Sequence, residues 1–358
     1  MSTSYGKNIN ITVYGGSHDE EIGVIAKGLP KGFRFDGGEL SAFMKRRAPG
    51  QNAFSTKRRE PDIPIFVSGV NDDNTLTGDA FHAVIKNTNQ RSSDYNNLSF
   101  VPRPSHADFA ARMKYGENVD LRGGGHFSGR LTAPMCIAGG ICLQILARKG
   151  IHIGAHIYSV GNVQDKPFDP VNVSKRDLDI LHCWKFPVLE GASGEKMKRL
   201  IETARRECDS VGGVIECAVV GLPAGLGEHM FDSVESAVAN IVFGIPAVKG
   251  IEFGAGFSAS ELRGSENNDP FYTDGKHIFT KTNNSGGILG GMTNGMPLIF
   301  RAAFKPTPSI AKEQDTVSLS KMENVKITVG GRHDPCVVPR AVPVIEAAAA
   351  LAVMDLMG

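Results

Sequence analysis

Two histidines and one short charged run supply the side chains that could carry protons in this chain. His18 follows Gly16-Ser17 at an expected strand end, and His106 follows Ser105 at an expected helix start. Imidazole is the side chain best suited to give or take a proton near neutral pH, although a histidine taken singly is more often structural. The run Arg332-His333-Asp334 adds a guanidinium that could hold a phosphate or carboxylate. Its carboxylate could accept a proton or pair with a neighbouring arginine.

A glycine-rich segment at 283–310 is the second candidate. It contains the pairs Gly286-Gly287 and Gly290-Gly291, and it closes on Lys305-Pro306-Thr307-Pro308-Ser309. Glycines let backbone N–H groups approach a flat or anionic ligand, and the closing residues offer an ammonium and hydroxyls for a phosphate. The residues alone fit a ligand cradle and a glycine-rich hairpin ending in a proline turn equally well.

Composition narrows the class of protein. Hydrophobic residues make up 41% and charged residues 22% of the 358 residues, which indicates a soluble globular enzyme. The net charge of +1 gives no overall attraction for nucleic acid, so an anionic ligand has to be met by local clusters such as Lys45-Arg46-Arg47 and Lys57-Arg58-Arg59. The cysteines are scattered without metal-type spacing, which favours a cytoplasmic location and a protein without a metal site. No signal-like or membrane-length apolar run is present, so we expect no membrane partner.

Familiar nucleotide and nucleophile motifs are missing. The chain has no G-x-G-x-x-G, no G-x-x-x-x-G-K-[ST] and no G-x-S-x-G. A Rossmann dinucleotide site, a P-loop and a nucleophile elbow are therefore excluded. What remains is an anion-binding site with proton carriers.

Hydrophobic periodicity predicts a single α+β domain over 1–358. Strands are expected at 8–14, 22–26, 64–70, 80–86, 151–160, 248–253 and 325–329. Helices are expected from Asp36, from Ser105, at 132–148, 196–207 and 232–243, and at 343–357 with Pro343 in the first turn. Similar Gly-Leu-Pro-x-Gly turns at 28–32 and 221–225 fit an internal duplication, with halves of about 1–205 and 206–358. Chance similarity explains the two turns nearly as well.

Longer motifs resemble those of the chorismate synthase family from one end of the chain to the other. They lie at 15–18, 46–51, 57–62, 103–108, 209–213, 283–291, 305–310 and 331–340. The resemblance implies a β-α-β sandwich with an internal pseudo-twofold repeat, assembled as a homotetramer. It also implies 1,4-anti elimination of phosphate from 5-enolpyruvylshikimate 3-phosphate, with reduced FMN (FMNH2) required although no net oxidation occurs. No insertion for a flavin reductase is visible, so we expect an external flavin reductant rather than NADP-dependent reduction by the chain itself.

The resemblance also implies roles for single residues. His18 would assist proton handling at the substrate, and His106 would protonate or steady the reduced flavin. Asp334 would work with flavin N5 in taking the ring hydrogen. Substrate anions would be held by Arg47, Arg130 and Arg332, with Ser17 nearby. FMN would be held by residues from several parts of the chain: His126, Phe127, Ser128, Ala247, Asn268, Gly290, Lys305, Pro306, Thr307, Pro308, Ser309 and Arg332.

Two rival functions stay open at this point. The same site could support a flavin-dependent oxidoreductase with true hydride transfer, which would consume reductant stoichiometrically. The chain could also be a catalytically lapsed flavin- or anion-binding protein, because Gly16, Asp19 and His126 depart from the family pattern. Retention of His18, His106 and Asp334 argues against the second alternative.

His126 replaces an arginine that the family usually carries, so a positive charge is present there only when the imidazole is protonated. We therefore expect the affinity for FMN to rise below neutral pH. Fluorescence titrations with FMN between about pH 6 and about pH 8, which bracket the ordinary histidine pKa, would measure this. An affinity that stays flat across that range would contradict the expectation.

Overall fold

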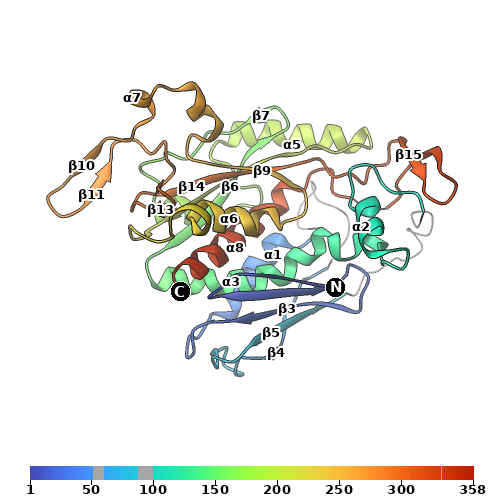
Figure 1. Cartoon of the computed structure of the whole chain (residues 1–358), viewed down its shortest axis with the longest axis horizontal. Helices are drawn as coiled ribbons and strands as arrows, with labels where there is room; N and C mark the ends of the chain where they lie inside the picture. Colours follow the sequence, from blue (N-terminus) through green and yellow to red (C-terminus); the bar gives the residue numbers. More distant parts are fainter. Residues whose placement is uncertain (51–59, 88–99, 332) are drawn as a thin grey trace.

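The computed structural model describes residues 1–50, 60–87, 100–331 and 333–358, which form two five-stranded antiparallel sheets with helices between them (Figure 1). The first sheet has the order β1-β2-β3-β5-β4, with bounds Ser2–Tyr5, Asn10–Gly15, Glu21–Lys27, Phe81–Lys86 and Ile65–Ser68. The second has the order β7-β6-β8-β14-β9, with bounds Val163–Gln164, His152–Val160, Gly213–Val220, Leu298–Phe304 and Val248–Phe253.

Four helices fill the space between the sheets: α1 (Gly37–Arg47), α3 (Thr132–Arg148), α6 (Val234–Phe243) and α8 (Val338–Leu356). Helix α3 packs on β2, β3 and β5 of the first sheet, and α8 packs on β6 and β8 of the second. Alternate residues of β3, namely Ile22, Val24 and Ala26, are fully buried, as expected for a strand with one face in the core. The α+β class and the β-α-β layering are confirmed.

The remaining elements decorate this sandwich. Helices α4 (Lys175–His182) and α5 (Gly191–Arg206) pack against β6, where a small apolar cluster includes Phe168 and Leu178. The other helices and three hairpins are α2 (Asp108–Tyr115), α7 (Gly264–Asn267), β10 (Phe271–Thr273) with β11 (Ile278–Thr280), β12 (Ile288–Leu289) with β13 (Met292–Thr293), and β15 (Gln314–Ser318) with β16 (Glu323–Ile327).

One helical stretch in the described part of the chain has the length and hydropathy of a membrane span. It runs from Gly129 to Arg148, but 89% of its apolar window is buried inside the protein. A helix that is apolar on every side is expected at the centre of a large core, and the burial of α3 fits that position.

Several expected boundaries are wrong in detail. Ser105 does not cap a helix, because its φ is +61° and α2 begins only at Asp108. The last helix begins at Val338 with Pro339 in its first turn, so Pro343 lies inside it. Asp36 is confirmed as the N-cap of α1, accepting hydrogen bonds from Gly38 and Glu39.

The two sheets do not coincide with the expected halves of the sequence. Strands β6 and β7 precede residue 205 but belong to the second sheet with β8, β9 and β14. The division at about 205, and the assignment of 1–358 to a single domain, stay predictions.

The contact between α3 and α8 depends on a glycine. A Cβ at Gly139 would lie 2.4 Å from Ala347 Cβ and 2.7 Å from Ala347 Cα. We expect Gly139→Ala to lower the free energy of unfolding by about 1–3 kcal/mol because it overpacks the core, although alanine raises helix propensity. Urea denaturation at fixed protein concentration would measure the change. Gly191→Ala is the control, since no atom lies within 4 Å of a Cβ there; a stabilised Gly139→Ala variant would contradict the prediction.

Candidate active site

A cavity of about 740 Å³ lies where β1, the start of α2, the 123–135 segment, the end of β14 and the loop before α8 meet. This volume suits a small molecule or a cofactor. Twelve of the residues expected from the sequence line it: Arg47, His106, His126, Phe127, Ser128, Arg130, Ala247, Lys305, Thr307, Pro308, Ser309 and Asp334. Segments 200 residues apart in the chain, such as those of Ser105 and Lys305, therefore share one wall.

His106 is held by a buried carboxylate. Its Nδ1 lies 2.6 Å from Asp108 Oδ1, and Arg103 donates to Asp108 from Nε and Nη2, each at 2.7 Å. Burial would raise the pKa of Asp108, but the hydrogen bonds from Arg103 and His106 outweigh it and hold that pKa well below its ordinary value. Asp108 is thus ionised and accepts a hydrogen bond from Nδ1–H of His106, so Nε2 is the nitrogen left to hold or release a proton at the cavity.

Three successive glycines bring the two predicted histidines together. Gly123, Gly124 and Gly125 all have positive φ, a conformation that other residues rarely adopt. A Cβ on Gly123 would lie 2.5 Å from His18 Nδ1 and a Cβ on Gly124 would lie 3.4 Å from His106 Nε2. The cavity is lined by Gly123, so His18 lies directly beside the cavity wall although it is not itself a lining residue.

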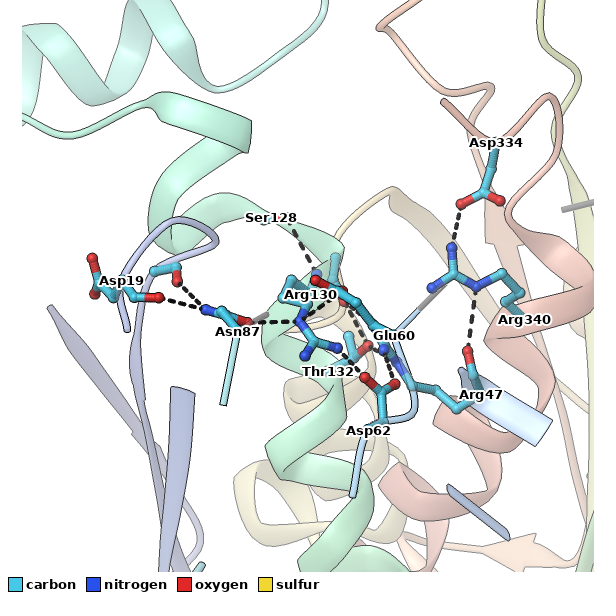
Figure 2. Close-up of polar contacts among 12 residues, drawn as sticks. Asp19, Arg47, Glu60, Asp62, Asn87, Ser128, Arg130, Thr132, Asp334 and Arg340 are labelled. Atoms are coloured by element: carbon cyan, nitrogen blue, oxygen red, sulfur yellow. Dashed lines mark hydrogen bonds and ion pairs between the residues drawn. The ribbon is translucent and has the colours of Figure 1, made fainter. Parts of the chain in front are cut away.

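Two arginines share one buried carboxylate (Figure 2). Arg47 Nη1 donates to Asp62 Oδ2 at 2.5 Å, and Arg130 Nη1 donates to Asp62 Oδ1. Glu60 Oε2 lies 3.3 Å from Arg130 Nε. Burial would raise the pKa of Asp62, but the two guanidiniums outweigh it and hold that pKa below its ordinary value. The two guanidiniums are therefore already oriented before any ligand binds.

Asp334 pairs with an arginine, the alternative that the sequence left open. Arg340 Nη1 donates to Asp334 Oδ2, and Arg340 Nε donates to the carbonyl oxygen of Arg47 at 3.3 Å (Figure 2). Beside it, His333 lines the cavity, and burial lowers the pKa of this histidine. Whether Asp334 also accepts a proton from substrate stays a prediction.

The far wall of the cavity is formed by residues 304–309 and Ala247. Lys305 N donates to Ala247 O at 2.9 Å, and Lys305 Nζ donates to Ser105 O. Burial and the nearby Lys249 lower the pKa of Lys305. The closing residues of the glycine-rich segment thus line the cavity, whereas its first part forms the β12–β13 hairpin. The hairpin is confirmed, and the binding of a ligand by the closing residues stays a prediction.

His126 joins the cavity to the first sheet. Its Nδ1 lies 2.8 Å from Gly15 O and its Nε2 lies 2.9 Å from Thr3 Oγ1. A neutral ring can satisfy both contacts, donating from Nδ1 and accepting at Nε2. His126 therefore ties β1 to the turn that carries His18, and its expected contact with FMN stays a prediction.

Some expected residues are not brought to the cavity. Ser17, Pro306, Asn268 and Gly290 are not among the lining residues, although Ser17 Oγ would lie 2.8 Å from a Cβ on Gly123. Arg332, together with Ala53 and Lys57-Arg58-Arg59, lies outside the described residues. Sequence reasoning missed Asp62, Asn87, Arg103, Asp108 and Arg340 as site residues, although all but Asn87 stand in motifs that had been recognised.

Buried polar atoms without a hydrogen-bond partner among the described residues indicate where a ligand would bind. They include Ser17 Oγ, Arg130 Nη2 and Thr307 Oγ1. Leaving such atoms unsatisfied is costly, so a ligand with oxygen acceptors is expected to complete them. No group of three or more histidine, cysteine and acidic side chains within the described ranges could hold a metal. The donor set suits an anion-bearing substrate and a phosphate-bearing cofactor.

Known proteins resemble this chain over almost its full length. A family model described as chorismate synthase matches residues 9–357. Chorismate synthases from Lancefieldella parvula and Dehalococcoides mccartyi are 43% and 45% identical, covering 100% and 99% of this chain and 96% of each relative. A solved structure described as a chorismate synthase crystal structure superimposes with a TM-score of 0.75 at 26% identity, covering 98% of this chain and 92% of that one.

The buried Arg103–Asp108 pair generates a stability prediction. We expect Asp108→Asn to lower the free energy of unfolding by about 3 kcal/mol at pH 7, because it leaves a buried guanidinium without its carboxylate. Since the folded-state pKa of Asp108 is lowered, this stabilisation is present above about pH 4 and is lost as pH falls toward the folded pKa. Urea denaturation across that pH range would measure it.

Asp120→Asn is the matched control, because the Asp120–Arg122 pair is exposed and is expected to change stability by less than about 0.5 kcal/mol. Equal losses in the two variants would contradict a special contribution from the buried pair.

Proposed function

Because this chain belongs to the chorismate synthase family, we propose that it converts 5-enolpyruvylshikimate 3-phosphate to chorismate. In this 1,4-anti elimination, the C–O bond to phosphate and one ring C–H bond break and a ring double bond forms. Phosphate and a proton leave, so the reaction balances without net oxidation. The observation that supports the proposal best is the meeting of two buried arginines with His106 and Asp334 at one cavity.

The substrate is held by charge. It carries a phosphate and two carboxylates, and the net charge of the chain is only +1, so its binding depends on local cations. Arg47 and Arg130 are buried and already oriented, and Arg130 Nη2 is without a hydrogen-bond partner among the described residues. We assign these two arginines, with Ser17 Oγ nearby, to the substrate anions. Arg332 is assigned to them as well, from the family motif.

The cofactor that we propose is reduced FMN, which when bound supplies electron density to the substrate ring as phosphate leaves. Lys305, Thr307 and Ser309 with the backbone at Ala247 form the wall that suits its phosphate and ring edge. Thr307 Oγ1 is buried and has no hydrogen-bond partner in the described part of the chain, as expected of a hydroxyl that donates to an anionic oxygen of a ligand. Phe127 and Ser128 contribute from the opposite segment.

We assign proton transfer to three side chains: His106, His18 and Asp334. Asp108 fixes the Nδ1 proton of His106, so Nε2 is the atom that holds or releases a proton at the cofactor. His18 is assigned to the substrate side, beside Gly123. Asp334 is assigned to the ring hydrogen, with Arg340 setting the orientation of its carboxylate.

We propose further that reduced flavin reaches the enzyme from an external reductant, and that the enzyme acts as a cytoplasmic homotetramer. Family membership supports each statement. Size-exclusion chromatography with light scattering would test the assembly, and turnover with NADPH plus oxidised FMN would test the source of reductant.

The decisive measurement is an anaerobic assay with 5-enolpyruvylshikimate 3-phosphate and reduced FMN. We expect chorismate to form without stoichiometric loss of reduced flavin. Oxidation of one flavin per product would instead indicate a flavin-dependent oxidoreductase. The absence of product would indicate a protein that has lost catalysis.

His106→Ala is expected to lower kcat by about 100-fold or more, the usual contribution of a positioned proton carrier. His229→Ala is the matched control, because the His229 side chain is 78% exposed and lies outside the cavity lining. Full activity of His106→Ala would overturn the assignment of that histidine.

A further inference from the structure

The Asn87 side chain lies between the turn that carries His18 and the guanidinium of Arg130. Asn87 Nδ2 donates to Asp19 O at 2.8 Å and to Gly16 O at 3.3 Å, and Asn87 Oδ1 accepts from Arg130 Nε at 3.0 Å (Figure 2). A carboxamide has two N–H donors and one carbonyl acceptor, so both of its ends are used. Asn87 immediately follows β5 and does not line the cavity.

The two donated bonds hold the turn from Gly16 to Asp19 at both of its ends. Ser17 and His18 lie between these two carbonyl groups, and Asp19 N closes the turn by donating to Gly16 O at 3.1 Å. Asn87 N also donates to Glu20 O at 3.0 Å, which fixes the chain just beyond the turn. The position of the His18 ring therefore depends on a side chain that is about seventy residues away in sequence.

The accepted bond sets the plane of the Arg130 guanidinium. Asn87 Oδ1 accepts from Nε–H, with Glu60 Oε2 3.3 Å from the same nitrogen, and Asp62 accepts from Nη1. Nη2 is then left buried without a hydrogen-bond partner within the described residues. A guanidinium is planar, so two fixed bonds determine where the third nitrogen points. The same carboxamide thus orients the nitrogen offered to a substrate anion.

We propose that Asn87 is a positioning residue that sets the distance and orientation of the His18 ring relative to the anion-binding Arg130. This inference rests on the proposed function, in which one group handles a proton on the substrate and the other holds the substrate by charge. A shift of about 1 Å between two such groups can reduce turnover about 100-fold. The proposed role requires a carboxamide, because a carboxylate at this position would accept from Arg130 but could not donate to the two carbonyl oxygens.

The test compares Asn87→Ala and Asn87→Asp with Gln144→Ala. Gln144 is the control, because its side chain is also a carboxamide bonded to backbone atoms, accepting from Asp36 N at 2.7 Å and donating to Asp36 O at 3.0 Å. It lies outside the cavity lining and has no place in the proposed chemistry. Unfolding midpoints, kcat, KM and the dissociation constant of the substrate would be measured for all three variants.

We expect Asn87→Ala to lower kcat/KM about 100-fold, with contributions from both kcat and KM, and Asn87→Asp to lose at least as much in kcat. Gln144→Ala should lose stability without a comparable loss in kcat/KM. The inference is overturned if Asn87→Ala retains kcat/KM within about threefold of wild type, or if Gln144→Ala loses as much activity for the same loss of stability.

Calorimetry with 5-enolpyruvylshikimate 3-phosphate and oxidised FMN gives a readout without turnover. We expect Asn87→Ala to weaken substrate binding about tenfold, the usual effect of losing one orienting hydrogen bond to a charged group. If the wild-type protein binds this substrate but forms no chorismate, the proposed function fails while weaker binding by Asn87→Ala still supports the positioning role. Unchanged binding together with unchanged kcat would refute that role independently of the proposed reaction.

Discussion

The carboxylate of Asp62 determines how two like charges can lie side by side at the cavity. Arg47 and Arg130 are each more than nine-tenths buried, and both donate to Asp62. Without a shared anion, two desolvated guanidiniums would repel each other and their burial would be unfavourable. With it, they are oriented in advance, and the reorganisation needed when a substrate anion binds is small. The pocket can therefore hold two oriented guanidiniums in a chain that is almost neutral overall.

A continuous series of polar contacts extends from this carboxylate across the site (Figure 2). In one direction Arg130 reaches the His18 turn through Asn87, and in the other the backbone of Arg47 accepts from Arg340, which holds Asp334. The groups proposed to handle protons at the substrate thus lie at the two ends of one hydrogen-bonded network. Such a network restrains each side chain more than isolated pairs would, because moving one member costs its neighbours their partners.

Close backbone approach provides the second constraint. The three glycines at 123–125 occupy positive φ, and side chains at the first two would contact His18 and His106. Deeper in the core, Gly139 plays a comparable part by letting α3 meet α8, whose N-terminal end follows Asp334 directly. Small residues therefore control how near the first sheet, the central helices and the C-terminal loop can come to each other.

Local sequence determined most of the secondary structure, because strand alternation, the Asp36 cap and the apolar helix at 132–148 are properties of neighbouring residues. It also determined the family, because the long motifs are stretches of neighbouring residues that identify the family. They do not reveal the geometry of the site. The Ser105 and Pro343 boundaries were wrong, because the nearby Arg103–Asp108 pair and Pro339 in the first turn of α8 decide where these two helices begin. Only the tertiary structure showed that Asp62, Asn87, Arg103 and Arg340 hold the residues of the site. Their partners are distant in sequence or depend on side-chain direction, which no spacing rule conveys.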